Sequence, residues 1–351
     1  MTLLKKTCQA MLPVDWEAAA QAQLRLDAKT KPRRSLGQLE DLACRLAAIY
    51  RTASPSLPAR AVVVMAGDHG VAEEGVSAYP GEVTMQMVQN FAAGGAAINV
   101  LARQAGARIV VVDMGTKAAA LPNGVRDHRL GPGTANMTRG PAMSRLNATL
   151  ALETGIRLAA ELIAEGISLI AVGDMGIGNT TAASAVTAVL TKTPVAQVSG
   201  RGTGIDSDRL QRKIAAIELA VKVNEPESTD PLDVLSKVGG FEIGGLAGVM
   251  LGSAAQQIPI VLDGFIAGAA ALIAVGLCPP LRDYLIAGHR SQEPGHAVIL
   301  RHLELQPLLD LGMRLGEGTG AVLALHLAEA SLRILAEMAT FSAAGVSDSG
   351  A

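Results

Sequence analysis

Short apolar runs alternate with polar turns along most of the chain. Such runs occupy residues 61–66, 107–115, 167–172 and 258–262, and an Asp and a glycine close or follow each of them. Stretches with apolar residues at helical spacing separate the runs. Strands that alternate with helices are typical of an α/β protein, in which helices bury a parallel sheet. We therefore predict a mostly parallel sheet flanked by helices.

The two ends of the chain lack such strand-like runs. Residues 16–28, 36–50 and 321–338 have the apolar spacing of amphipathic helices. Ser35 is predicted to cap the second of these helices, because Gln38 stands three residues further on. We expect the two ends to form a small helical appendage to the sheet.

Composition narrows the possible partners and the cellular compartment. The 351 residues are 49% hydrophobic and only 2% aromatic, with a net charge of −2 and no basic run, so we expect no nucleic-acid partner. Three widely spaced cysteines, Cys8, Cys44 and Cys278, indicate a reducing compartment and no disulfide framework. Lys5 and Lys6 precede no apolar stretch, so we predict a cytoplasmic protein without a signal peptide.

One segment, residues 258–277, has the length of a membrane span. Asp263 and Gly264 interrupt it, and a carboxylate inside lipid is costly. A buried strand, a turn and an Ala-rich helix explain the segment as well. We favour that interpretation and predict no membrane association.

Two glycine loops are candidates for binding a phosphate. GDMGIGNTT, residues 173–181, joins a predicted strand to a predicted helix, so its N–H groups and the helix N-terminus would form an anion cradle. GRGTG, residues 200–204, is predicted to be a second such loop at a strand end, with Lys213 on the next helix. Plain turns and a solvated Lys213 remain the alternatives at this point.

A single carboxylate, Glu317, is enclosed by glycines in LGMRLGEGTGA, residues 311–321. In a bend among apolar segments it would be partly buried, which raises the pKa of a carboxyl group and suits it to accept a proton near neutral pH. An acid at a helix start also favours the helix dipole or caps the helix. From this stretch alone, both interpretations stay open.

The histidines do not form a recognisable metal motif. His69 lies beside Asp68, and His289 and His296 flank Glu293, but the chain has neither an HExxH sequence nor paired cysteines. It also lacks the GxSxG sequence of serine hydrolases. We expect no metal and no cofactor.

Seven longer motifs are more specific than any single loop. Between Lys31 and Ala321 the chain contains, in order, KPRRSLGQLEDLA, AGDHGVAEEGVSAYPGEVTMQMVQNF, GDMGIGNTTAASA, GRGTGIDSDRLQRK, VLDGFIAGAAAL, HRSQEPGH and GMRLGEGTGA. With these motifs it resembles the nicotinate-nucleotide:5,6-dimethylbenzimidazole phosphoribosyltransferases over nearly its whole length. The resemblance implies transfer of the phosphoribosyl group of nicotinate mononucleotide to 5,6-dimethylbenzimidazole. Inversion at C1′ would give nicotinate and α-ribazole 5′-phosphate, which serves cobalamin biosynthesis.

The resemblance also implies an architecture. The large domain, residues 60–300, would be a Rossmann-like α/β domain that binds nucleotide and base. A small helical domain would comprise residues 1–59 and 301–351, with the Glu317 loop facing the site of the large domain. The family further implies a homodimer without a cofactor.

Site residues follow from the family motifs. The resemblance implies that Glu317 is the catalytic base. We therefore prefer that interpretation to the one in which Glu317 caps a helix. Phosphate and ribose are expected to contact Asp174, Gly176, Gly178, Asn179, Thr180, Gly202, Thr203, Lys213 and Ser291. The incoming base is expected to contact Ser77, Gln86, Met175 and Leu315.

Two positions depart from the family pattern. Arg34 stands where the family motif KP-x-GSLG has glycine, and Asp174 stands where GEMGI has Glu. The carboxylate at position 174 is therefore kept but shortened by one methylene. A change in rate or in base preference would be the consequence if this acid takes part in the reaction.

The sequence also has to be compared with two other functions. A nucleotide-dependent oxidoreductase would require GxGxxG after its first strand, where this chain has GDHG. A non-catalytic sensor of nucleotide or base with the same fold is the other rival. The retained Glu317 argues against a sensor, whereas Asp174 argues slightly for one. Turnover, as opposed to binding alone, separates these two functions.

Overall fold

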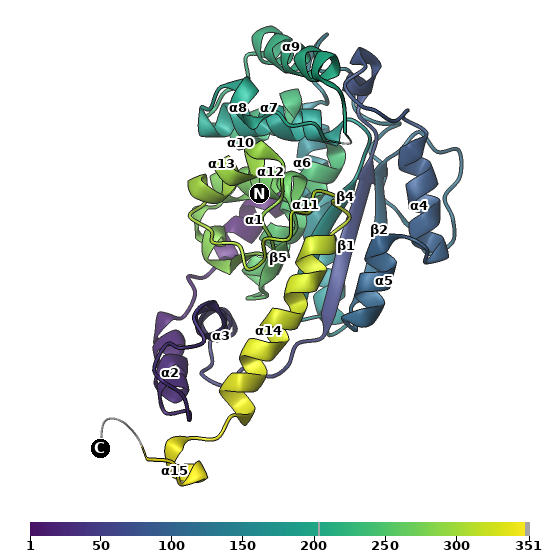
Figure 1. The fold of residues 1–351 in the computed structure, drawn as a ribbon. Coiled ribbons are helices and arrows are strands. Elements are labelled where there is room, and N and C mark those ends of the chain that lie inside the picture. The colour runs from purple at the N-terminus through teal and green to yellow at the C-terminus, as the bar shows by residue number, and fades with distance from the viewer. Residues whose placement is uncertain (203, 348–351) are drawn as a thin grey trace.

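A six-stranded, fully parallel sheet forms the centre of the molecule (Figure 1). The computed structural model describes residues 1–202 and 204–347. The strand order is β3-β2-β1-β4-β5-β6. The strand bounds are β1 Arg60–Gly67, β2 Arg108–Gly115, β3 Arg126–Asp127, β4 Leu169–Met175, β5 Ile260–Leu262 and β6 Leu285–Ala287. The predicted fold class is thereby confirmed.

The apolar runs become strands because helices cover the sheet on both faces. Val63 and Met65 of β1 belong to a core shared with the helices of one face, whereas Val62 and Val64 belong to the core of the other. Neighbouring residues of a strand point to opposite faces, so a strand covered on both faces is apolar throughout. That burial explains why the runs are continuous and do not alternate with polar residues.

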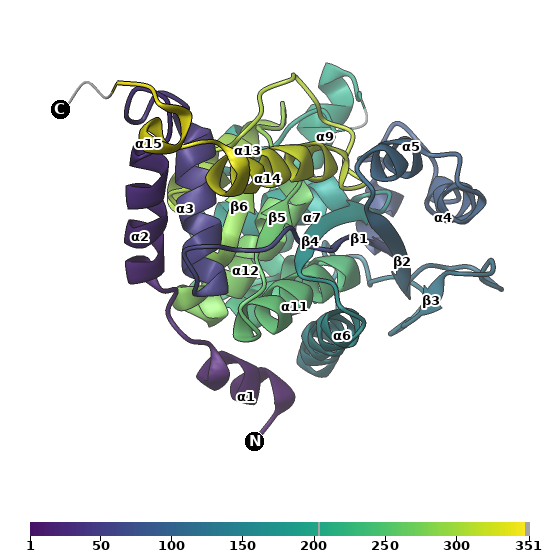
Figure 2. The same cartoon turned by 90° about the horizontal axis from the view of Figure 1, so that it is seen from below.

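The helices lie in two layers, which Figure 2 shows edge-on with α6, α11 and α12 on one side and α4, α5 and α14 on the other. The helical bounds are α1 Leu3–Ala10, α2 Trp16–Asp27, α3 Gln38–Tyr50, η1 Gly70–Glu74, α4 Val83–Ala93, α5 Ala97–Gln104, α6 Arg145–Ala164, α7 Asn179–Thr191, α8 Val195–Val198, α9 Ser207–Asn224, α10 Pro231–Val238, α11 Phe241–Ala255, α12 Phe265–Leu277, η2 Pro279–Tyr284, α13 Pro294–His302, α14 Thr319–Glu337 and α15 Phe341–Ala344. The predicted helices are all present, with ends shifted by a few residues.

Helices from both ends of the chain meet beside α14. In Figure 1, α2, α3 and α15 lie together at the end of α14 that points away from the sheet. Small and branched side chains of α2, α3 and α14 form a cluster there, namely Ala22, Leu26, Ala43, Ala47 and Leu335. The first half of α14 instead packs on β4, β5 and α5, and α1 packs on α6 and α11. The terminal helices therefore contact the large α/β body as well as one another.

Two details of the sequence analysis are wrong. Ser35 does not cap α3; the helix begins at Gln38 after Gly37, which has a φ of 53° and makes no side-chain cap. Strands β3 and β6 were not predicted, because two or three residues are too few for a periodic pattern.

The segment with the length of a membrane span forms β5, a turn and α12, as predicted. From Ile260 to Ala274 every residue of this segment is buried. Among the described residues, one helix, Thr319–Glu337, is long and apolar enough to cross a membrane, and 56% of its most apolar stretch is buried in the molecule. A core helix passes the same test, so this helix is weak evidence for a span.

Candidate active site

A cavity of about 460 Å³ opens where β4 and β5 end. It is lined by the loop after β4, the turn between β5 and α12, the segment before α13 and the segment before α14. The carboxyl ends of parallel strands are the usual position of a ligand site, close to the point where strand order reverses. Here that point lies between β1 and β4, which are neighbours in the sheet.

Glu317 occupies an unusual backbone conformation beside this cavity. Its φ is 63°, between 85° at Gly316 and 88° at Gly318, so three consecutive residues are left-handed. Its N–H donates to the Asp174 carbonyl oxygen over 3.2 Å, and its Oε2 accepts from the Ile98 N–H over 3.4 Å. A non-glycine residue held in this region is costly, and such residues cluster at functional sites.

Asp263 holds the bend that contains Glu317. Its Oδ2 accepts from the Gly318 N–H over 3.2 Å, and its Oδ1 accepts from the Gly320 N–H over 2.7 Å. Asp263 thus satisfies the free N–H groups at the start of α14. The alternative that Glu317 caps this helix is therefore wrong, because its carboxylate turns toward Ile98 instead.

A glycine on β4 lets the bend come close to the sheet. A Cβ atom at Gly173 would collide with the backbone of Glu317 and Gly318. Glycine is therefore required at position 173 for the Glu317 bend to pack directly on the strand.

Several buried carboxylates lie close to one another at the cavity. Asp174 and Asp263 line it, whereas Glu317 follows the lining residue Gly316 and is itself outside the lining formed by the described residues. Burial raises the pKa of Glu317, and the Asp263 carboxylate adds to the rise although the Ile98 N–H opposes it. Burial also raises the pKa of Asp174 well above its usual value, and the Asp263, Glu242 and Glu317 carboxylates add to it. A raised pKa makes a carboxylate a better proton acceptor near neutral pH. The site therefore contains two acids suited to proton transfer.

The GDMGIGNTT loop has the predicted strand–loop–helix setting. α7 begins at Asn179 after Gly178, whose φ is 97°. Asp174 Oδ2 accepts from the Asn179 side-chain amide over 2.8 Å, and Thr180 lines the cavity. A Cβ atom at Gly176 would collide with the Gly67 carbonyl oxygen, so the loop packs directly on β1. The start of α7 therefore lies at the cavity, which Asn179 and Thr180 line. The N–H groups of Asn179 and Thr181 donate within the loop, to the carbonyl oxygens of Gly176 and Gly178.

Lys213 is fully buried, so the alternative of a solvated helix face is wrong. Its Nζ donates to Thr180 Oγ1 over 2.9 Å and to the Gly200 carbonyl oxygen over 3.1 Å. Burial lowers the pKa of Lys213 to about 8, against the opposing effect of Glu293. Lys213 therefore joins α9 to both glycine loops.

The GRGTG loop is not at a strand end, contrary to prediction; it follows the short helix α8. The Gly202 N–H donates to Glu293 Oε1 over 2.9 Å, and the Gly202 carbonyl oxygen accepts from Arg314 Nη1 over 2.5 Å. Gly202 lines the cavity, whereas Thr203 lies outside the described residues.

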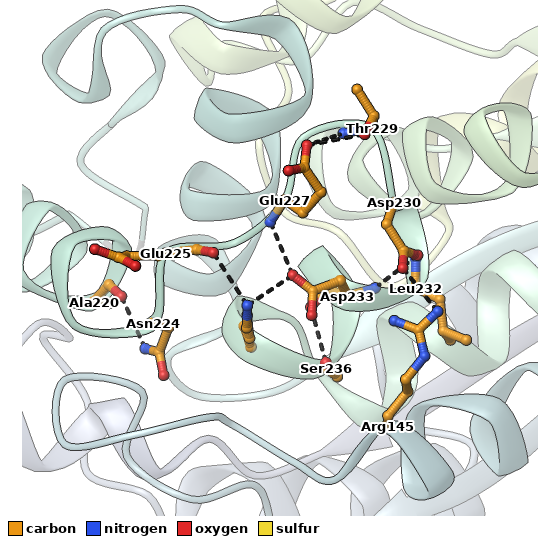
Figure 3. A network of polar contacts seen from close by, with 11 residues as sticks. Arg145, Ala220, Asn224, Glu225, Glu227, Thr229, Asp230, Leu232, Asp233 and Ser236 are labelled. Atoms are coloured by element: carbon orange, nitrogen blue, oxygen red, sulfur yellow. Dashed lines mark hydrogen bonds and ion pairs between the residues drawn. The ribbon is translucent and has the colours of Figure 1, made fainter.

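A polar network fixes the turn that connects α9, which carries Lys213, to α10 (Figure 3). Arg145 pairs with Asp230 over 2.8 Å, and the Glu227 N–H donates to Asp233 Oδ2 over 2.8 Å. Asp230 also accepts from the Leu232 N–H over 3.1 Å at the start of α10. These contacts hold the turn that follows α9.

The residues expected to contact the base are only partly brought together. Met175 and Leu315 line the cavity. Ser77 is half-buried in the loop that carries Tyr79, which also lines the cavity, whereas Gln86 is exposed on α4. Ser77 and Gln86 are absent from the cavity lining formed by the described residues.

Sequence reasoning missed several residues of the site. Ser291 was expected and lines the cavity, but Glu293, Arg314 and His289 line it too. Each lies in a motif that was quoted for the resemblance, so membership of such a motif was the available signal. Among residues 1–202 and 204–347, no three His, Cys, Asp or Glu side chains form a group that could hold a metal.

A second missed feature is a buried ion pair beneath the site. His69 Nε2 and Glu242 Oε1 lie 2.7 Å apart, and both side chains are at most 1% exposed. The His69 ring lies against the GDMGIGNTT loop, because a Cβ atom at Gly176 would be 3.5 Å from the His69 Cδ2. No spacing in the sequence connects positions 69 and 242.

Comparisons with a family model and with curated proteins point to the same family. A family model described as phosphoribosyltransferase matches residues 11–346. The chain is 58% identical over 349 residues to the nicotinate-nucleotide–dimethylbenzimidazole phosphoribosyltransferase of Roseiflexus sp. (strain RS-1), with 99% of each chain covered. It is 57% identical over 350 residues to that of Chloroflexus aggregans (strain MD-66 / DSM 9485), again with 99% of each chain covered.

A solved structure has the same fold. The crystal structure of the nicotinate-nucleotide–dimethylbenzimidazole phosphoribosyltransferase from Thermus thermophilus matches with a TM-score of 0.90 and 50% identity. The match covers 95% of this chain and 99% of that chain. Fold, site and family model together define a phosphoribosyltransferase, that is, a pentosyltransferase. The chain belongs to the nicotinate-nucleotide–dimethylbenzimidazole phosphoribosyltransferase family.

Proposed function

We propose how this chain transfers the phosphoribosyl group of nicotinate mononucleotide to 5,6-dimethylbenzimidazole. One imidazole nitrogen of the base attacks C1′ while the bond from C1′ to nicotinate breaks, and nicotinate leaves with the bonding electrons. Attack from the face opposite the leaving group inverts C1′ and yields α-ribazole 5′-phosphate. The other imidazole nitrogen must lose its proton, so the reaction requires a base.

Glu317 accepts that proton in our proposal. The observation that carries the assignment is a buried carboxylate with a raised pKa, held in a strained bend beside the cavity. Burial removes water that would otherwise compete for the proton, and a pKa near the working pH favours general-base catalysis. Asp174 is the second acid of the site, and its Asn179 contact orients it.

The phosphate lies, in our proposal, between the two glycine loops. Gly176, Gly178, Asn179 and Thr180 would contribute N–H and side-chain donors at the start of α7, where the helix dipole also attracts an anion. Gly202, Lys213 and Ser291 would close the other side. Support comes from the position of Lys213, which hydrogen-bonds both loops. The proposed part of Thr203 falls outside the described residues.

The incoming base would lie against the apolar side chains of Met175 and Leu315, both of which line the cavity. Ser77 and Gln86 would approach it from the loop before α4 and from α4 itself. Holding base and nucleotide side by side makes the attack effectively unimolecular, which supplies much of the rate enhancement.

A single incubation tests the function. The purified chain with nicotinate mononucleotide and 5,6-dimethylbenzimidazole should release nicotinate and α-ribazole 5′-phosphate, separated by chromatography. Binding of both ligands without either product would instead favour the sensor alternative. The names of the full-length relatives support the catalytic assignment.

The substrate affinity should depend on pH through Lys213. With a pKa of about 8, the ammonium loses its proton as pH rises through that value, so kcat/KM for nicotinate mononucleotide should fall above about pH 8. Lys213→Arg keeps the charge, so the alkaline fall should disappear from its profile even if its absolute rate is lower. Lys222→Arg, exposed on the same helix, is the control. An unchanged alkaline fall in Lys213→Arg would contradict the prediction.

Restoring the longer acid at position 174 should be tolerated. Asp174→Glu is expected to leave kcat/KM equal to or above that of the wild type, because the Asp174 carboxylate borders an open cavity. Steady-state kinetics compare it with Asp174→Asn, which removes the charge. A loss of more than about tenfold in Asp174→Glu would show that the loop has adapted to the shorter side chain.

The cellular location, the oligomeric state and the domain division of the chain are also proposals. We infer a cytoplasmic protein from its three free cysteines and from its membership of a family of biosynthetic enzymes. We infer a homodimer, for which the exposed apolar side chains Trp16 and Leu24 of α2 offer support. We keep the division into residues 60–300 and residues 1–59 plus 301–351. Sedimentation of the purified chain measures its oligomeric state.

A further inference from the structure

Glu293 is a buried acid in the wall of the cavity to which the mechanism gives no role. It is 6% exposed and precedes the first residue of α13, yet its side chain makes no capping bond to that helix. Its Oε1 instead accepts from the Gly202 N–H of the GRGTG loop over 2.9 Å. Its Oε2 is buried without a hydrogen-bond partner among the described residues.

A buried carboxylate oxygen without a partner is unfavourable and calls for an explanation. Helix capping does not provide one, because the cap bond is missing. Lys213 does not provide one either: its ammonium donates to Thr180 and Gly200, and Glu293 acts on it only through its charge. Glu293 therefore keeps one carboxylate oxygen without a hydrogen bond, in the wall of the cavity where we propose that the phosphate binds.

The same donors serve the proposed phosphate. Carboxylate and phosphate are both oxyanions that accept hydrogen bonds from backbone N–H groups. A single N–H makes one well-aligned hydrogen bond, and two neighbouring anions repel each other. A phosphate can consequently accept a hydrogen bond from the Gly202 N–H only after the Glu293 carboxylate has lost its own hydrogen bond to that group.

We propose that Glu293 is an internal competitor for the phosphate, which sets how strongly the site holds phosphate-bearing ligands. In the empty site its carboxylate occupies the Gly202 N–H, so free phosphate binds weakly. The whole nucleotide displaces it because ribose and nicotinate add contacts that free phosphate lacks. Glu293 is thus a specificity-determining residue, an inference that rests on the proposed position of the phosphate.

Inorganic phosphate is the probe for the test. Calorimetric titration of the full chain should give a Kd for phosphate at least about tenfold lower in Glu293→Gln than in the wild type, because one repelling charge is removed. Phosphate should likewise inhibit turnover of nicotinate mononucleotide at lower concentration. Glu304→Gln removes the same charge at an exposed position just after α13 and should leave the Kd unchanged.

The results distinguish failure of this inference from failure of the proposed phosphate position on which it rests. Phosphate binding that is equal or weaker in Glu293→Gln overturns the inference, since a purely supporting role predicts a loss of affinity. If that variant does not fold, Glu293→Asp decides, because its shortened carboxylate withdraws from Gly202; an unchanged or higher Kd overturns the inference. Lys213→Met should weaken phosphate binding. If both Lys213→Met and Glu293→Gln leave the Kd unchanged, the phosphate lies elsewhere and both proposals fail.

Discussion

Replacing Glu317 by Gln is expected to lower kcat by about 10²- to 10⁴-fold, the usual contribution of a general base. Gln has the same shape and the same backbone demands at a φ of 63°, so the bend should persist. The amide can still contact the Ile98 N–H through its oxygen, but it cannot accept the proton of the benzimidazole. The loss should therefore fall on kcat and leave ligand binding nearly intact.

Steady-state kinetics and calorimetry with 5,6-dimethylbenzimidazole separate those two effects. Glu337→Gln removes the same charge at the other end of α14, where the Glu337 side chain is 61% exposed, and should retain full turnover. The wild-type rate should also rise with pH through the raised pKa of Glu317, a dependence that Glu317→Gln should lack. Near-normal turnover in Glu317→Gln would remove Glu317 from the mechanism.

Replacing Glu242 by Gln is expected to lower the free energy of unfolding by about 3–5 kcal/mol, the usual cost of leaving one partner of a buried ion pair alone. His69 and Glu242 are both buried at the end of β1, and Glu242 Oε1 is the atom 2.7 Å from His69 Nε2. Because His69 packs against the GDMGIGNTT loop, the affinity for nicotinate mononucleotide should fall as well.

The stability difference should depend on pH. Burial alone lowers the pKa of His69, but the Glu242 carboxylate and Asp68 outweigh it, so its pKa in the folded chain lies above the ordinary 6.5. The pair therefore stabilises the fold fully below about pH 6.5 and loses this contribution as pH rises through the folded pKa. The difference between wild type and Glu242→Gln should shrink accordingly.

Urea unfolding at several pH values measures this difference. Glu161→Gln breaks the surface pair with Arg126 and is the control, expected to cost at most about 1 kcal/mol because water screens exposed pairs. A Glu242→Gln variant as stable as the control at low pH would show that His69 is neutral in the folded chain.

Much of the site was predictable because its elements are local in sequence. The GDMGIGNTT loop lies between β4 and α7 as predicted, since glycines and threonines after an apolar run favour a turn into a helix. Glu317 is buried beside the cavity, as the surrounding glycines and apolar residues indicated. The predicted roles of both in the reaction stay predictions until they are measured.

By itself, the sequence determined the parallel α/β class and the family, and it singled out the acid that we propose as the base. Apolar periodicity and motif order are written into the order of neighbouring residues, so they can be read without a structure. Only the tertiary structure decided that Asp263, rather than Glu317, satisfies the start of α14. It also decided that Lys213 is buried and that Glu293 holds Gly202. These contacts join residues far apart in the chain, and their partners are selected by packing and by the need to satisfy buried polar groups, which no local pattern records.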